Sequence, residues 1–155
     1  MIKEIHVYDM DGTVVCSMHR YRTMPCNTRI DLQHWLDNEH LAHMDTLLPL
    51  AKQYQEHLKD PEVYVIIATA RVLNKPDMDF IKNTLGQPNK IISRRDRKDW
   101  RSGFELKARP LKSLFSLKQF KNAKKWFYED NKDYLYPVAE HCNMTPVYIP
   151  SNQGY

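Results

Sequence analysis

Two aspartates separated by one residue follow an apolar segment near the N-terminus of this 155-residue chain. The segment IHVY leads directly into Asp9, Met10, Asp11, Gly12 and Thr13. In an extended backbone the side chains at positions i and i+2 point the same way, so Asp9 and Asp11 would project together from the end of a strand. Adjacent carboxylates repel each other unless a cation or a shared proton compensates. The pair therefore indicates a Mg²⁺ site or a general acid/base pair.

Two other interpretations of this Asp-x-Asp-Gly segment compete. It could be a surface turn, because Asp and Gly favour turns. It could also open a calcium-binding loop, but such a loop needs an acidic or amide residue at Thr13, glycine at Val14 and glutamate at Arg20, and the sequence has none of these. The calcium loop is excluded by its spacing, and the turn stays open on this segment alone.

The elements that must position these carboxylates alternate between strand and helix patterns. Apolar runs rich in β-branched and aromatic residues predict strands at 2–9, 63–69, 90–93, 126–129 and 145–149. Helical periodicity predicts helices at 45–58, 77–85, 110–120 and 133–142, with Asp45 as an N-cap and Pro110 in a first turn. This order predicts an α/β, doubly wound, Rossmann-like fold with a mainly parallel sheet of about five strands and helices on both faces.

One segment interrupts the alternation. Residues from about 17 to 44 carry mixed charge, Pro25 and a short helical pattern around 31–37. A connection of this length is usually functional or disordered. We expect it to be a flap over the site, too small to be a second domain, so that residues 1–155 form a single domain.

Polar side chains also end other predicted strands. Thr69 ends the run VYVIIAT, and Glu129 and Asp130 end the run WFYED. In open α/β sheets, ligands bind outside the carboxyl ends of the strands. We therefore expect these residues to converge with Asp9 and Asp11 at one edge of the sheet.

Composition excludes several classes of protein. The three cysteines, Cys16, Cys26 and Cys142, form no Cys-x-x-Cys pair, so neither a disulfide framework nor a zinc thiolate site is indicated, and a reducing cytoplasm is expected. The four glycines are too scattered for a dinucleotide-binding or Walker loop. There is no apolar stretch of membrane-spanning length and no signal peptide, so no membrane partner is expected. A net charge of +4 permits a polyanionic partner without requiring one.

Four segments together resemble the haloacid dehalogenase (HAD) superfamily of aspartate-nucleophile phosphohydrolases. They are DMDGT, VIIAT, GFELKARPL and FYEDNKD, and they span the chain from Ile5 to Asp133. The resemblance implies that Asp9 is the nucleophile, which forms an aspartyl-phosphate, and that Asp11 is the general acid. It further implies that Mg²⁺ is held by Asp9, by the backbone carbonyl of Asp11 and by Asp130, with help from Glu129.

The same resemblance assigns the remaining site residues. Thr69 would donate hydrogen bonds to the phosphoryl oxygens, and a lysine would neutralise the charge of the transition state. Lys107 is favoured over Lys112, because it lies just ahead of the helix predicted at 110–120, whereas Lys112 would be inside it. Arg71, directly after the second strand end, is a candidate for an additional phosphate clamp.

At this length we expect no full cap domain, and an open site suits a large substrate. The segments ATAR, SRRDRKDWRSG and PVYIPSNQGY resemble the phosphatase domain of phage-type polynucleotide kinases, which implies a 3′-phosphatase of DNA or RNA ends. In the second segment, Trp100 could stack on a base while the surrounding arginines contact phosphates, and a solvated loop is an equal alternative. A nucleotide or small-metabolite phosphatase and a noncatalytic nucleic-acid-binding HAD-fold protein are the competing functions.

Overall fold

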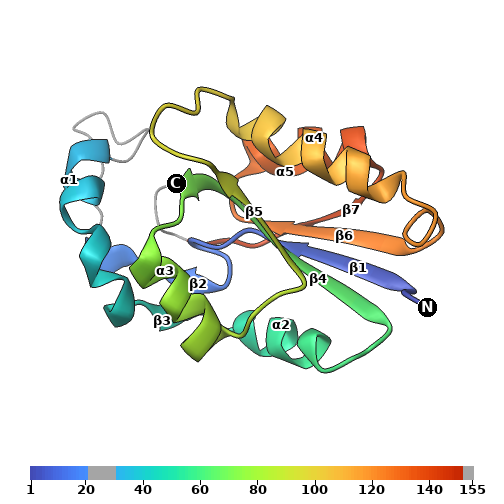
Figure 1. Cartoon of the computed structure of the whole chain (residues 1–155), viewed down its shortest axis with the longest axis horizontal. Coiled ribbons are helices and arrows are strands. Elements are labelled where there is room, and N and C mark those ends of the chain that lie inside the picture. The colour runs from blue at the N-terminus through green and yellow to red at the C-terminus, as the bar shows by residue number, and fades with distance from the viewer. Residues whose placement is uncertain (21–30, 152–155) are drawn as a thin grey trace.

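The computed structural model describes residues 1–20 and 31–151. A central sheet of five parallel strands has the order β5-β4-β1-β6-β7 (Figure 1). The strands are β1 (Glu4–Tyr8), β4 (Val63–Val72), β5 (Lys90–Arg94), β6 (Lys124–Glu129) and β7 (Thr145–Tyr148). The prediction of a doubly wound α/β fold is confirmed.

Helices cover both faces of this sheet (Figure 1). One face packs against α4 (Gly103–Phe115) and α5 (Lys132–Cys142), and the other against α2 (Ala51–Leu58), α3 (Lys75–Phe80) and the π-helical turn η3 (Ile81–Leu85). The alternation of side chains along β1 serves both layers, because Ile5 and Val7 face the first core and Tyr8 faces the second. Within the described ranges, no helix has the length and apolar character needed to span a bilayer.

Strand β1 lies in the middle of the sheet, so its pairing with β4 and β6 determines which of their residues are level with its own carboxyl end. Tyr8 is paired in parallel register with Ile67 of β4 on one side and with Tyr128 of β6 on the other. The residues that follow these positions therefore reach the same edge of the sheet. This register brings Asp9, Thr69 and Glu129 to a common edge.

The helix predicted at 45–58 is wrong in its first part. Thr46–Leu47 form a short strand, β3, which pairs antiparallel with β2 (Val15–Cys16), and α2 begins only at Ala51. Asp45 is consequently not the N-cap of this helix. Its side chain is buried and paired with Arg20, which is a long-range contact that the local pattern does not reveal.

The helix predicted at 110–120 begins and ends earlier in the structure. Ser102 caps α4, since its side chain accepts a hydrogen bond from the Glu105 backbone N–H at 3.1 Å. Serine followed three residues later by glutamate is a helix-start pattern, and it takes precedence here over the preference of Pro110 for a first turn. Pro110 therefore lies inside the helix, which ends at Phe115. Lys107, expected just ahead of the helix, also lies inside it, so the reason for favouring it over Lys112 was wrong. The helix predicted at 77–85 is also divided, into α3 and η3.

The predicted flap segment departs from the core at β2 and returns at β3. Its described parts form η1 (Met18–Arg20), α1 (Leu32–Asp37) and η2 (Glu39–Met44). Asp31 caps α1 by accepting a hydrogen bond from the backbone N–H of His34 at 3.2 Å. Residues 21–30, which include Pro25 and Cys26, lie outside the described part of the chain.

Candidate active site

A tight loop after β1 fixes the position of Asp9. The backbone N–H of Asp9 donates to the carbonyl of Tyr128 at 2.9 Å, which ties it to β6. The carbonyl of Met10 then accepts hydrogen bonds from the three successive N–H groups of residues 13–15, so the chain turns sharply. Gly12 provides this turn with a φ of 82°, a conformation that side chains disfavour. The Thr13 hydroxyl donates to Asp9 Oδ2 at 3.1 Å.

Three buried carboxylates gather at this edge of the sheet. Oxygens of Asp9, Glu129 and Asp130 all lie within 4.8 Å of one another. Burial raises the pKa of Asp9 to about 7, with repulsion from Glu129 adding to the effect. Burial and the neighbouring Asp9 together raise the pKa of Asp130 to about 7. The pKa of Glu129 is also raised, chiefly by burial.

This cluster suits a divalent metal ion. Asp130 Oδ2 is buried and has no hydrogen-bond partner within residues 1–20 and 31–151. Carboxylate oxygens are the ligands that Mg²⁺ prefers, and a divalent cation would relieve the repulsion that raises these pKa values. The predicted ligands Asp9, Glu129 and Asp130 are therefore brought together. The side chain of Asp11 lies outside this group.

Lys107 supplies a positive charge to the carboxylate cluster. Its Nζ lies 3.1 Å from Asp9 Oδ1 and 2.6 Å from Glu129 Oε2, and the residue is 1% exposed. Burial alone would lower the pKa of Lys107, but the two carboxylates outweigh it and raise that pKa. Lys112 is exposed, because five residues of α4 turn it about 140° away from Lys107.

The strand predicted to end at Thr69 continues to Val72, so both Thr69 and Arg71 lie within β4. Thr69 is buried, with 2% of its surface exposed. It stands two positions beyond Ile67, the residue paired with Tyr8, and so at the level of the loop after β1. Its Oγ1 accepts a hydrogen bond from the backbone N–H of Arg71 at 3.4 Å. The register thus brings the predicted phosphate-binding threonine to the edge where the carboxylates lie.

Asp11 and Arg71 form an ion pair beside the carboxylate cluster. Arg71 Nε donates to Asp11 Oδ2 at 2.5 Å, and the Ser17 hydroxyl donates to Asp11 Oδ1 at 3.1 Å. Burial acts to raise the pKa of Asp11, but the Arg71 guanidinium outweighs it and holds this pKa below its ordinary value. Arg71 Nη1 lies 2.8 Å from Asp77 Oδ2. The guanidinium predicted to clamp a phosphate is therefore held between two carboxylates.

A buried charge network links the flap segment to this ion pair, and sequence reasoning missed it. Arg20 is fully buried and pairs with Asp45 at 2.7 Å and with Asp77 at 3.1 Å. Trp35 of α1 packs against the guanidinium groups of Arg20 and Arg71 at 4.4 and 5.0 Å from its ring centre. Nothing in the local sequence marks Arg20 as buried, because its partners lie 25 and 57 residues away.

We expect Arg20→Met to lower the free energy of unfolding by about 3 kcal/mol, because it leaves buried carboxylates without their partner. The midpoint of urea denaturation, followed by circular dichroism, measures this loss. Lys75→Met is the matched control, since Lys75 forms an exposed pair with Asp79 at 2.9 Å and should cost about 1 kcal/mol or less. Equal losses in the two variants would contradict a structural role for the buried network.

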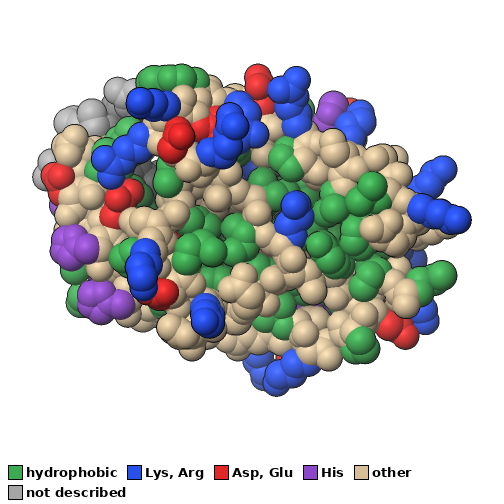
Figure 2. All heavy atoms as spheres, viewed as in Figure 1, with side chains coloured by type: hydrophobic (Ala, Val, Ile, Leu, Met, Phe, Trp, Pro, Cys, Tyr) green, Lys and Arg blue, Asp and Glu red, His purple; other side chains and the backbone are tan. Residues whose placement is uncertain are grey.

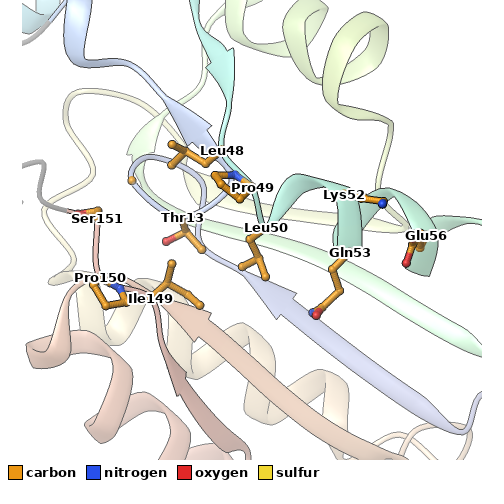
Figure 3. Close-up of a pocket in the computed structure, with 11 residues that line it drawn as sticks. Thr13, Leu48, Pro49, Leu50, Lys52, Gln53, Glu56, Ile149, Pro150 and Ser151 are labelled. Carbon is orange, nitrogen blue, oxygen red and sulfur yellow. The ribbon is translucent and has the colours of Figure 1, made fainter.

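A pocket of about 690 Å³ opens beside the loop after β1 (Figure 3). Leu50 and Gln53 of the α2 region line one side, and Ile149 and Pro150, which follow β7, line the other. Thr13, whose hydroxyl contacts Asp9, lies between these walls. The pocket therefore combines apolar walls with a residue of the carboxylate loop.

Comparisons with known proteins find relatives of this chain in sequence and in fold. The family model described as bacteriophage T5 5′-deoxynucleotidase matches residues 1–142. A 5′-deoxynucleotidase of Escherichia phage T5 is 33% identical over 88 residues, which cover 52% of this chain and 35% of that protein. The match thus spans about a third of the relative's length. A chain from the structure of the Pnkp1/Rnl/Hen1 RNA repair complex has the same fold, with a TM-score of 0.66 at 17% identity over 96% of this chain and 42% of that one.

Proposed function

The chain belongs to the bacteriophage T5 5′-deoxynucleotidase family, and on this premise we propose that it is a Mg²⁺-dependent phosphomonoester hydrolase that acts on nucleotide phosphates. The family match confirms the resemblance to HAD phosphohydrolases that the four motifs indicated. One observation carries the proposal. Asp9 is held between Lys107 and Thr13 within a cluster of buried carboxylates, which is the arrangement that a phosphorylated aspartate requires.

The proposed reaction takes place in two displacements. Asp9 attacks phosphorus, the bond from phosphorus to the ester oxygen breaks, and Asp11 gives a proton to that oxygen. Because Arg71 holds the pKa of Asp11 below its ordinary value, this step requires Arg71 to release the Asp11 carboxylate so that it can bind a proton. In the second displacement the Asp11 carboxylate takes a proton from water, whose oxygen attacks phosphorus and releases phosphate from Asp9. Bound Mg²⁺, held by the carboxylates of Asp9, Glu129 and Asp130 and by the backbone carbonyl of Asp11, would neutralise charge on the nucleophile and on the phosphate.

The other site residues have supporting roles in this proposal. Lys107 would offset the charge that develops on the phosphoryl oxygens, and Thr69 would donate a hydrogen bond to them. Arg71 would hold Asp11 at the edge of the loop, because its guanidinium binds that carboxylate from the side. The predicted contact of Arg71 with a substrate phosphate remains part of this proposal and requires the guanidinium to reach beyond its two carboxylate partners.

Two substrate classes are candidates for this site. The family and the 5′-deoxynucleotidase relative favour a deoxynucleoside 5′-monophosphate, and the pocket beside Thr13 has the volume and apolar walls of a small-ligand site. The exposed basic loop between β5 and α4 favours the second class, 3′-phosphorylated DNA or RNA ends. Phosphate release from mononucleotides and from matched oligonucleotides with a 3′- or 5′-phosphate distinguishes them. No release from any of these substrates with Mg²⁺ present would refute the proposed activity.

Removal of metal provides a further prediction. We expect chelation by EDTA to reduce phosphate release at least about 100-fold and Mg²⁺ to restore it, because the buried carboxylates need a counter-ion. Mg²⁺ should also raise the thermal unfolding midpoint of the wild-type protein, since a ligand that binds the folded state stabilises it. Asp130→Asn should lose most of this midpoint shift. Full activity in EDTA would show that the cluster needs no metal.

We also propose that residues 1–155 form one hydrolase domain, with the segment at about 17–44 as a flap over the site. The buried pairs of Arg20 with Asp45 and Asp77 support this, because they attach the flap to the core. Among the described cysteines, Cys16 and Cys142 are both free thiols, which supports a reducing compartment such as the cytoplasm.

A further inference from the structure

The loop between β5 and α4, residues 95–102, is held in shape by a half-buried arginine at the end of β5. Arg94 Nε donates to the carbonyl of Ala70 at 2.7 Å, which ties the start of the loop to β4. Arg94 Nη1 donates to the carbonyls of Asp99 and Arg101, both at 2.6 Å. One guanidinium thus fixes both ends of the loop.

A buried aspartate stabilises the loop from within. Asp99 is 8% exposed, and its carboxylate accepts hydrogen bonds from the backbone N–H groups of Arg95 and Arg101 at 3.1 and 3.3 Å. The same carboxylate pairs with the Arg101 side chain at 2.6 Å. The negative charge of Asp99 is therefore neutralised inside the loop and does not reach its outer surface.

The outer surface of this loop presents an indole and three cations to solvent. Trp100 is 90% exposed, although the residues on either side of it are hydrogen-bonded. Arg95, Arg97 and Lys98 are exposed beside it, with Asp96 as the one exposed acid among residues 95–100. Figure 2 shows Lys and Arg side chains gathered over the region where Figure 1 draws this loop. The hydrogen-bonded loop therefore holds an indole in solvent next to cations, which is the combination that proteins use to bind single-stranded nucleic acids.

The loop stands at the same edge of the sheet as the carboxylate cluster. Its anchor, Ala70, lies between Thr69 and Arg71, and Arg97 reaches across to Glu39 of the flap segment at 3.2 Å. A ligand whose phosphate lies at Asp9 therefore has this surface next to it along the edge. Figure 1 shows the loop rising beside α1 at that end of the molecule.

We infer that residues 95–100 form a docking surface for a single-stranded nucleic acid, with one base stacked on Trp100 and backbone phosphates contacted by Arg95, Arg97 and Lys98. This inference rests on the proposed function, because it places the reacting phosphate at the end of a strand. A mononucleotide has a single phosphate, which the catalytic site takes, so none is left to contact Arg95, Arg97 and Lys98. A strand supplies further phosphates and a base for the indole.

Binding of a short fluorescein-labelled oligothymidylate that has a 3′ hydroxyl and no terminal phosphate tests this surface without any hydrolysis. We expect Trp100→Ala to weaken binding, measured by fluorescence anisotropy, about tenfold, and Trp100→Phe to retain most of the affinity. Replacement of Arg95, Arg97 and Lys98 together by alanine should reduce the slope of log K against log salt by about 2, since each phosphate contact contributes about 0.7.

Matched controls separate this surface from general effects of charge and exposure. Tyr136→Ala removes another exposed aromatic residue, and replacement of Lys118, Lys121 and Lys124 by alanine removes the same charge at the opposite end of the sheet. Both should bind as the wild type does. Undetectable binding by the wild type, or equal affinity of Trp100→Ala and the wild type, would overturn the inference.

Two results distinguish this inference from the proposed function. Tight, Trp100-dependent binding of the oligonucleotide together with no phosphatase activity on any substrate would refute the function and support the surface. If Trp100→Ala instead raised the KM for thymidine 5′-monophosphate by the same factor as it weakened oligonucleotide binding, the occupant would be a single nucleotide. That result would overturn the inference that a single-stranded nucleic acid binds this surface.

Discussion

Asp9→Asn is expected to reduce phosphate release by about 10⁴-fold or more while the protein keeps its fold. The amide has nearly the shape of the carboxylate and keeps an oxygen that Lys107 and Thr13 can contact, but it is not a nucleophile towards phosphorus. It also removes one of three mutually repelling carboxylates, so the folded protein without metal should lose little stability. Initial rates with saturating Mg²⁺ and the unfolding midpoint measure the two effects.

Asp133→Asn is the control for this substitution. Asp133 lies in the same acidic segment, four residues after Glu129, but it is exposed in the first turn of α5 and outside the carboxylate cluster. Its replacement should leave the rate within about twofold, as for a surface substitution away from the site. Comparable rates for Asp9→Asn and the wild type would show that another group accepts the phosphoryl group.

Lys107→Met is expected to have the second largest effect, on both activity and stability. It should lower kcat/KM by about 10²- to 10³-fold, because it removes the positive charge beside the reacting carboxylate. It should also lower the free energy of unfolding of the metal-free protein by about 3 kcal/mol, because Asp9 and Glu129 lose a partner at 1% exposure. Steady-state kinetics and urea denaturation in EDTA measure these changes.

Lys112→Met on the same helix provides the comparison. Lys112 is exposed, so its replacement should leave kcat/KM unchanged and change the free energy of unfolding by about 0.5 kcal/mol or less. If Lys112→Met lost more activity than Lys107→Met, the lysine that offsets the phosphoryl charge would be Lys112. If Lys107→Met were as active as the wild type, the positive charge of Lys107 would have no role in the reaction.

The sheet could be predicted from the sequence because its strands are local, nearly continuous apolar runs. The apolar run at 63–69 predicts a strand, and β4 contains all of these residues. The helix at 45–58 could not be placed correctly, since Thr46 and Leu47 form a strand only through pairing with Cys16 and Val15, which lie about thirty residues earlier. Local periodicity carries no information about such a partner.

In the candidate site, too, some positions could be predicted from local sequence and others depend on distant contacts. The convergence of Asp9, Glu129 and Asp130 followed from the rule that parallel strands end at one edge, and the structure brings these residues together. The position of Arg71 did not follow, because its environment depends on Asp77 and on Trp35 of the flap. A charged side chain takes its role from whichever opposite charge folding brings near, and the sequence alone does not give that contact.

The central position of β1 also determines when the site can form during synthesis. The contact of Asp9 with Lys107 spans 98 positions, and β6 must be made before β1 has a neighbour on its second side. Pairings between such distant segments form slowly. A nascent chain that ends before Asp130 therefore lacks part of the carboxylate cluster. Any gain in stability from Mg²⁺ should appear only after Asp130 has emerged from the ribosome.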